Sequence, residues 1–212
     1  MEKKELIKEA AVIILASAIL AAAISFRNNS ILYISLISFF IIILANSITK
    51  KIVSYFLEID VKIKFWSWYQ YWVRKDSHFK RPLPMFWLPL ILSLISKGYF
   101  WWLAILEFDV TSKVERVSKR HGLYRFTEVT EWHIAGIAVA AIIVNLILAI
   151  IAYVIPISGF ETFAKLSIYY CAWSIVPLSS LDGSKIFFAS RKLWLITAII
   201  VGILTLWALT TV

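Results

Sequence analysis

The sequence predicts a mainly α-helical membrane protein with about five transmembrane helices, a re-entrant segment and a small membrane-associated β-sheet. Hydrophobic residues make up 61% of the 212 residues, and the mean hydropathy is +0.81. Several apolar runs are long enough to cross the roughly 30 Å of a bilayer core. No internal repeat or low-complexity linker divides the chain, so we expect a single integral membrane domain over residues 1–212.

The first two apolar runs predict two spanning helices, over residues 10–26 and 31–48. The second is expected to end at Thr49-Lys50-Lys51, where the charges begin. Alanines late in the first run could be read as a signal-peptide cleavage region. The acidic residues ahead of that run favour a retained helix instead.

After the second apolar run, the spacing of the apolar residues changes to an alternating pattern that predicts strands. Apolar and polar residues alternate over residues 59–65 and again over 106–111, as in a strand with one apolar face. Lys62 and Lys64 on the first segment suit cross-strand pairing with Glu107 and Asp109 on the second. Between them lies an aromatic cluster typical of the headgroup zone: Trp66, Trp68, Tyr69, Tyr71 and Trp72.

The distribution of basic residues decides the expected topology. Residues 83–105 are apolar but interrupted by prolines, a lysine and a glycine, and three further runs cover 133–155, 165–181 and 193–211. If 83–105 enters and leaves on one side, 19 of the 22 basic residues fall in cytosolic segments. We therefore expect a multi-pass protein of the cell membrane with a cytosolic N-terminus.

Charge and cysteine content limit the partners and the cysteine-based sites that the chain is expected to have. The net charge of +9 suits cytosolic loops beside a lipid bilayer, and nucleic acid is not an expected partner. The single cysteine, Cys171, excludes an intrachain disulfide and a cysteine-based zinc site.

The stretch most indicative of function is Ser174 to Phe188, because Asp182 ends an apolar run there. An ionisable residue beside hydrocarbon is costly and is therefore a functional-site candidate. Pro177 precedes it and can break the incoming helix, and Gly183 follows it and permits a tight turn.

This stretch resembles the site-2 proteases, the zinc-dependent intramembrane metalloproteases. Pro177 and Leu181-Asp182-Gly183 look like the proline and LDG motif of that family, in which the aspartate is the third zinc ligand. Asn145 matches the asparagine of a family pattern on an earlier helix, while Ser174 replaces the asparagine that precedes the motif proline. The resemblance implies a family-like fold with a membrane-associated strand region.

The second helix departs from the family at the decisive point. In the family an HExxH motif supplies two histidine ligands and the catalytic glutamate; Ala45, Asn46 and Thr49 stand at those positions here. Alanine has no donor atom, threonine is a poor zinc ligand, and an amide cannot act as a general base. The resemblance is therefore to a divergent member without the catalytic motif, and no cofactor is expected.

Other residues offer weaker routes to catalysis. The three histidines are His78, His121 and His133, and only His133 is placed where it could approach Asp182, with Glu128 or Glu131 completing a relocated metal site. Ser179, Ser180 and Ser184 surround Asp182 but lack a recognisable base, so we expect them to satisfy backbone groups freed around the proline.

The leading interpretation is a catalytically silent, site-2-protease-like protein that binds a transmembrane segment or a membrane partner. We expect Asn46 and Thr49 to face Asp182 or its loop; Asp182 would be protonated, paired with a lysine such as Lys185, or facing water. Two alternatives stay open. One is an active intramembrane metalloprotease that holds zinc through non-standard ligands, and the other is a transporter or channel with Asp182 and Asn145 lining a polar path.

Overall fold

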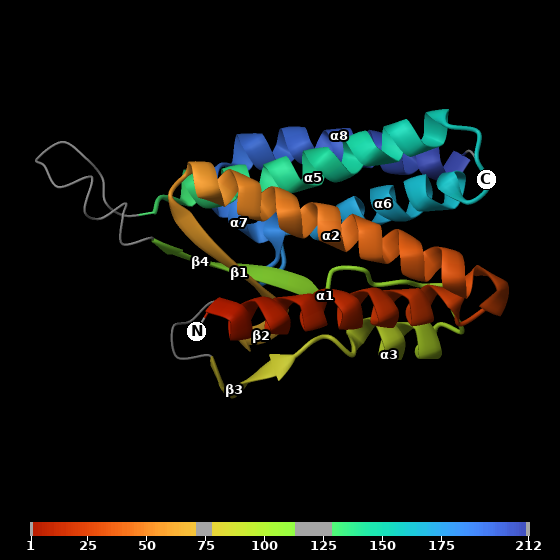
Figure 1. Ribbon diagram of the computed structural model, residues 1–212, viewed down its shortest axis with the longest axis horizontal. Helices are drawn as coiled ribbons and strands as arrows, with labels where there is room; N and C mark the ends of the chain where they lie inside the picture. Colours follow the sequence, from red (N-terminus) through yellow and green to blue (C-terminus); the bar gives the residue numbers. More distant parts are fainter. Residues whose placement is uncertain (1, 71–77, 113–128, 211–212) are drawn as a thin grey trace, which may run out of the picture.

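Four long apolar helices form the body of the molecule, and two small β-sheets lie toward one end of it (Figure 1). The computed structural model describes residues 2–70, 78–112 and 129–210. In chain order the elements are α1 (Glu2–Ser25), η1 (Asn29–Ile31), α2 (Leu32–Phe56), β1 (Ile59–Phe65), β2 (Ser67–Gln70), β3 (His78–Pro84), α3 (Leu88–Ile95), β4 (Leu106–Ser112), α5 (Glu131–Val154), α6 (Phe160–Ser174), α7 (Asp182–Ala189) and α8 (Arg191–Thr210).

Within the described residues, four helices are long and apolar enough to cross a membrane: α1, α2, α5 and α8. Their outward faces carry large apolar side chains, and on α8 these include Ile196, Ile203 and Leu206 with exposed fractions of 58–66%. Their inward faces are rich in small residues such as Ala138 and Ala141, which let helix backbones approach closely. These features define a multi-pass membrane protein.

The predicted count of five spanning helices is wrong by one. The run over residues 165–181 was expected to span, but α6 ends at Ser174 and has only 15 residues. A helix of that length covers about 22 Å, less than the bilayer core. The helix stops early because Pro177 disfavours helical backbone in the residue before it and donates no hydrogen bond.

Helix α2 is longer than expected and continues to Phe56. Lysine is a good helix former, so Lys50 and Lys51 do not end the helix. Lys50 lies inside it and is only 3% exposed. The buried lysine brings a positive charge to the inner face of a spanning helix.

The predicted pairing of the two alternating segments is confirmed. β1 and β4 form an antiparallel sheet in which Lys64 lies opposite Glu107 and Lys62 opposite Asp109. Lys64 Nζ lies 3.2 Å from the Glu107 carboxylate and 2.7 Å from that of Asp109. Lys62 turns away to Glu5 of α1 instead, at 2.7 Å. A second two-stranded sheet joins β2 and β3.

The segment between β3 and β4 runs out along α1 and returns (Figure 1). Ser93 on α3 donates a hydrogen bond of 2.7 Å to the Ala23 carbonyl near the end of α1. Gly98, at the turning point, approaches Arg27 so closely that a Cβ there would lie 3.0 Å from the Arg27 Cβ. The segment contributes one short helix, α3, and no helix of spanning length.

Within the aromatic cluster, Trp66 is more buried than a headgroup position predicts, whereas Tyr69 is 41% exposed. Trp66 is fully buried and stacks on Trp102 with ring centroids 5.9 Å apart. Trp102 in turn contacts Trp173 of α6 at 4.5 Å. The rings therefore join the sheets to the helices, while Tyr71 and Trp72 lie outside the described residues.

One end of the helix bundle, which we call the Asp182 end, holds a cluster of charged side chains. It is formed by the start of α1, the last turns of α2, the start of α5, and α7 (Figure 1). Lys51 of α2 pairs with Glu9 of α1 there, and Glu9 also accepts a hydrogen bond from the Ile63 backbone of β1 at 3.2 Å. The sheet is thus fastened to both helices beside the candidate site.

Candidate functional site

Asp182 is the first residue of α7 and is 4% exposed. The chain leaves α6 at Ser174, passes the exposed Pro177 and re-enters a helix at Asp182. Leu181, at the N-cap, is 1% exposed and packs in a cluster with Trp66. A carboxylate in the first turn of a helix is favoured by the helix dipole, so the turn places Asp182 where part of its burial cost is offset.

Gly183 is required by close packing rather than by an unusual backbone angle. A Cβ at this position would lie 2.1 Å from the Ile175 carbonyl oxygen and 2.6 Å from that of Val176. No side chain fits at those distances. The glycine therefore lets α7 press against the turn that leaves α6, which fixes the position of Asp182.

The partner of Asp182 is Lys50. Lys50 Nζ donates a hydrogen bond of 2.6 Å to Asp182 Oδ2, and the side chains are only 4% and 5% exposed. Asp182 Oδ1 is buried without a hydrogen-bond partner. Of the three states that the sequence left open for Asp182, the structure shows the lysine-paired one, with Lys50 in the place that we expected for Lys185.

The degenerate motif positions lie beside this pair but do not bind it. The Thr49 hydroxyl donates to the Ala45 carbonyl of its own helix at 2.8 Å. Asn46 is 3% exposed, and its Nδ2 is buried without a partner. In the contacts that the structure describes, neither Asn46 nor Thr49 makes the expected hydrogen bond to Asp182. Lys50, which lies one turn beyond Asn46 on the same helix face, binds Asp182 instead.

Lys185 binds the sheet instead of Asp182. Its Nζ donates to the Phe108 carbonyl of β4 and lies 3.5 Å from the centroid of the Phe108 ring. Burial lowers the pKa of Lys185 to about 8; Asp182 opposes this shift and Lys50 adds to it. Lys50 Nζ lies 4.7 Å from the same ring, so Phe108 contacts both ammonium groups.

A buried carboxylate of β4 completes the charged cluster. Glu107 is 1% exposed, lies 3.2 Å from Lys64 Nζ, and accepts a hydrogen bond from the Ser180 hydroxyl. Burial lowers the pKa of Lys64, but its hydrogen bonds to Asp109, Tyr69 and Glu107 outweigh burial and raise the pKa above the ordinary value. Charge pairing therefore ties the sheet to the turn before Asp182.

Asn145 and Ser174, the other family positions, are both buried. Asn145 is fully buried, and neither its Nδ2 nor its Oδ1 has a hydrogen-bond partner. Its backbone carbonyl accepts a bond of 2.9 Å from Ser167 of α6. Ser174 is 5% exposed and forms the last residue of α6.

Of the three serines around Asp182, Ser184 bonds the backbone as expected, whereas the Ser180 hydroxyl donates to the Glu107 carboxylate instead. The Ser184 hydroxyl is bonded to the carbonyls of Ser179 and Leu181 at 2.6 and 2.8 Å. Ser179 adopts a left-handed conformation with φ of 50°, which marks the tightness of this turn. These contacts satisfy carbonyl groups that the interrupted helix leaves open.

The histidines do not assemble a metal site in the described part of the chain. The Nδ1 atom of His133 accepts a hydrogen bond of 3.3 Å from the Thr130 backbone N–H and so caps α5. His121 and Glu128 lie outside the described residues, and His78 belongs to β3. Among the described residues, no three His, Cys, Asp or Glu side chains lie together as metal ligands.

Zinc does not fit the residues at the Asp182 end. A zinc ion binds carboxylate oxygen at about 2.0–2.2 Å and needs three protein ligands. Here an ammonium group lies 2.6 Å from the Asp182 carboxylate, and Ala45 and Thr49 supply no suitable donor. In the described part of the chain, the arrangement holds a fixed positive charge against Asp182 and does not offer three ligands to the metal that the resemblance implies.

Comparison with known proteins finds no relative for this chain. No protein-family model, no curated protein and no solved structure matches it.

Sequence reasoning missed three residues of the site: Lys50, Glu107 and Phe108. The signal for Lys50 was present, because it follows Asn46 by four positions and so shares the inner face of α2. The lysine was assigned to a cytosolic segment on charge alone. Glu107 was placed in the sheet, but its contact with Ser180 joins elements 73 positions apart and follows only from the tertiary packing.

Proposed function

We propose that the protein is a catalytically silent member of the site-2 protease family that binds a transmembrane segment or another membrane partner. The observation that carries the proposal is the buried ion pair between Lys50 and Asp182. The lysine provides the positive charge that a metal ion would provide beside the aspartate of an LDG motif.

The need to balance the charge of Asp182 links the presence of Lys50 to the absence of the HExxH motif. An unpaired carboxylate buried in a protein interior is strongly unfavourable, so loss of a metal requires another cation or loss of the acid. Lys50 is held within the inner face of α2, the helix that carries Ala45, Asn46 and Thr49. Replacement of the metal by an ammonium group preserves the turn while removing the Lewis acid and the general base.

Unused hydrogen-bonding groups support a binding role. Asn46 Nδ2, both polar atoms of the Asn145 side chain and Asp182 Oδ1 are buried without partners. Leaving such a group unpaired costs about 1–3 kcal/mol. A partner segment that offers backbone N–H and C=O groups would recover part of this cost when it enters.

The proposed orientation follows from the basic residues. The Asp182 end faces the cytosol of a cell membrane, because the described lysines at the start of α1, in the last turns of α2 and in α7 lie at that end. The N-terminus of α1 is then also cytosolic. Access of antibodies or proteases to tags at either end of the chain tests this orientation.

Metal analysis tests the silent state. The purified wild-type protein is expected to contain no stoichiometric zinc, and stoichiometric zinc would contradict the proposal. A stricter test restores the motif with Ala45→His, Asn46→Glu and Thr49→His, with and without Lys50→Met. Zinc is expected to bind only when Lys50 is also removed, since its ammonium group otherwise competes for the carboxylate of Asp182.

Site-specific photocrosslinking tests the binding role. A photoreactive amino acid at Asn46 should capture a membrane protein or peptide in native membranes. The same amino acid at Ile200, a 49% exposed position on α8, is the control for random lipid-phase contacts. Equal capture at both positions would refute binding at this site.

A further inference from the structure

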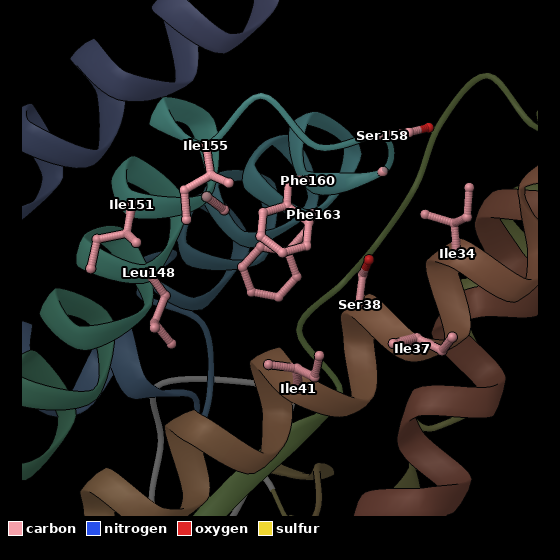
Figure 2. A pocket seen from close by; sticks show the side chains of 12 residues that line it. Ile34, Ile37, Ser38, Ile41, Leu148, Ile151, Ile155, Ser158, Phe160 and Phe163 are labelled. Carbon is pink, nitrogen blue, oxygen red and sulfur yellow. The ribbon is translucent and has the colours of Figure 1, made fainter.

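A hollow lies on the side of the bundle, away from the charged cluster. It is a cavity of about 360 Å³ between the first half of α2 and the last turns of α5, closed by the start of α6. Figure 2 shows Ile34, Ile37 and Ile41 of α2 on one side and Leu148, Ile151 and Ile155 of α5 on the other, with Phe160 and Phe163 between them. Its lining is apolar except for Ser38 and Ser158.

The cavity opens on the surface that faces lipid. Ile37 and Ile151 stand at its rim with exposed fractions of 59% and 51%, while Ser38 and Ala152 deeper inside are 3% and 6% exposed. The rim continues into the exposed apolar faces of the same two spanning helices. An apolar hollow does not hold ordered water, because water there would have too few polar partners.

Its depth matches one leaflet. Ser158 and Gly159 belong to the connector between α5 and α6, at the end of the bundle opposite to Asp182. From Ile34 to Ile41 the hollow follows α2 for about 10 Å, within the roughly 15 Å of one hydrocarbon leaflet. Lys50 lies about 13 Å further along the helix, so the hollow does not reach the charged cluster.

The surroundings of the cavity select the occupant. Its lining is apolar and it opens toward the lipid, so the molecules that reach it are the acyl chains of the surrounding bilayer. One extended acyl chain is narrow enough to enter between isoleucine side chains. At the cavity, where α2 and α5 do not touch each other, such a chain would make van der Waals contacts with both helices.

We infer that the cavity between α2 and α5 is a binding site for one acyl chain of a phospholipid from the leaflet opposite to the Asp182 end. The headgroup lies beside Ser158, and the chain descends between α2 and α5 toward Ile41 and Leu148. The site is separate from the proposed function and does not depend on it.

Photolabelling with phospholipids in proteoliposomes tests the site. Phosphatidylcholine with a diazirine near its headgroup should label Ile34 and Phe160, and one with a terminal diazirine should label Ile41 and Leu148. The substitution Ala152→Trp fills the cavity and should reduce this labelling to the level on the exposed face of α8. Ile37→Trp blocks the rim and gives the same result if Ala152→Trp fails to fold, whereas Ile200→Trp on α8 leaves the labelling unchanged.

Three results would overturn the inference. The first is wild-type labelling in the cavity no stronger than on α8, which would mean general lipid contact only. The second is a reversed order of depth, which would place the chain in the other leaflet. The third is crosslinking of the cavity residues to a protein in native membranes, which would identify a partner helix as the occupant.

Discussion

Replacement of Lys50 by methionine should leave the buried carboxylate of Asp182 without its counter-ion. Both side chains are at most 5% exposed and lie 2.6 Å apart, so water cannot take over the role of the ammonium group. Breaking a buried ion pair by removal of one partner costs about 3–5 kcal/mol. The unfolding equilibrium constant should therefore rise by about a hundredfold to a few thousandfold.

Reversible unfolding in mixed micelles measures this loss. The double substitution Lys50→Met with Asp182→Leu should recover most of the stability, because apolar replacement of a buried pair is often neutral or stabilising. Lys62→Met is the matched control: it breaks a lysine–carboxylate pair of similar length, 2.7 Å, whose side chains are 47% and 48% exposed. If Lys50→Met costs no more than Lys62→Met, the pair does not hold the site together.

Three further outcomes are expected. Gly183→Ala should destabilise the protein by about 1–3 kcal/mol or more in the same unfolding assay, because the new methyl group meets backbone atoms, whereas Gly136→Ala, with open space around its Cβ, should be neutral or stabilising. The stability of the wild type relative to Lys185→Met should rise between pH 8 and pH 10.5, where the unfolded chain holds a proton that folded Lys185 has lost; a flat difference would contradict the lowered pKa. Ser93→Ala should cost about 1 kcal/mol by removing a buried hydrogen bond to α1, and an unchanged unfolding midpoint would show that this contact does not hold α3.

Local sequence patterns predicted the elements that depend mainly on neighbouring residues in the chain. The alternation over residues 59–65 and 106–111 predicted that the two segments pair. The observed register keeps their apolar side chains on one face, because a one-residue slip would turn every side chain to the opposite face. The turn around Asp182 was also recognisable, since Pro177 limits the helix before it. The reason for Gly183 was not, because its contact with the Ile175 carbonyl appears only when α7 is folded back.

Predictions from the average composition of a segment were wrong where a single residue determined the structure. Apolar content over residues 165–181 suggested a spanning helix, yet a single proline ends α6 at Ser174. Charge content predicted that the second helix ends at Lys50 and Lys51, yet Lys50 lies within the helix bundle, paired with the buried carboxylate of Asp182. A residue's partner is a tertiary property, so a single sequence reveals the helix face that carries Lys50 but not the group that the lysine meets.

The return of the chain from α3 to β4 has a consequence for biogenesis. Residues 101–105 have no regular secondary structure, and lipid alone would leave backbone groups of this stretch unpaired. They are covered partly by α6, through contacts such as that between Trp102 and Trp173, which follows 71 positions later in the chain. The stretch therefore gains its full cover only after α6 has been synthesised, so the native packing of this segment forms late in the growth of the chain.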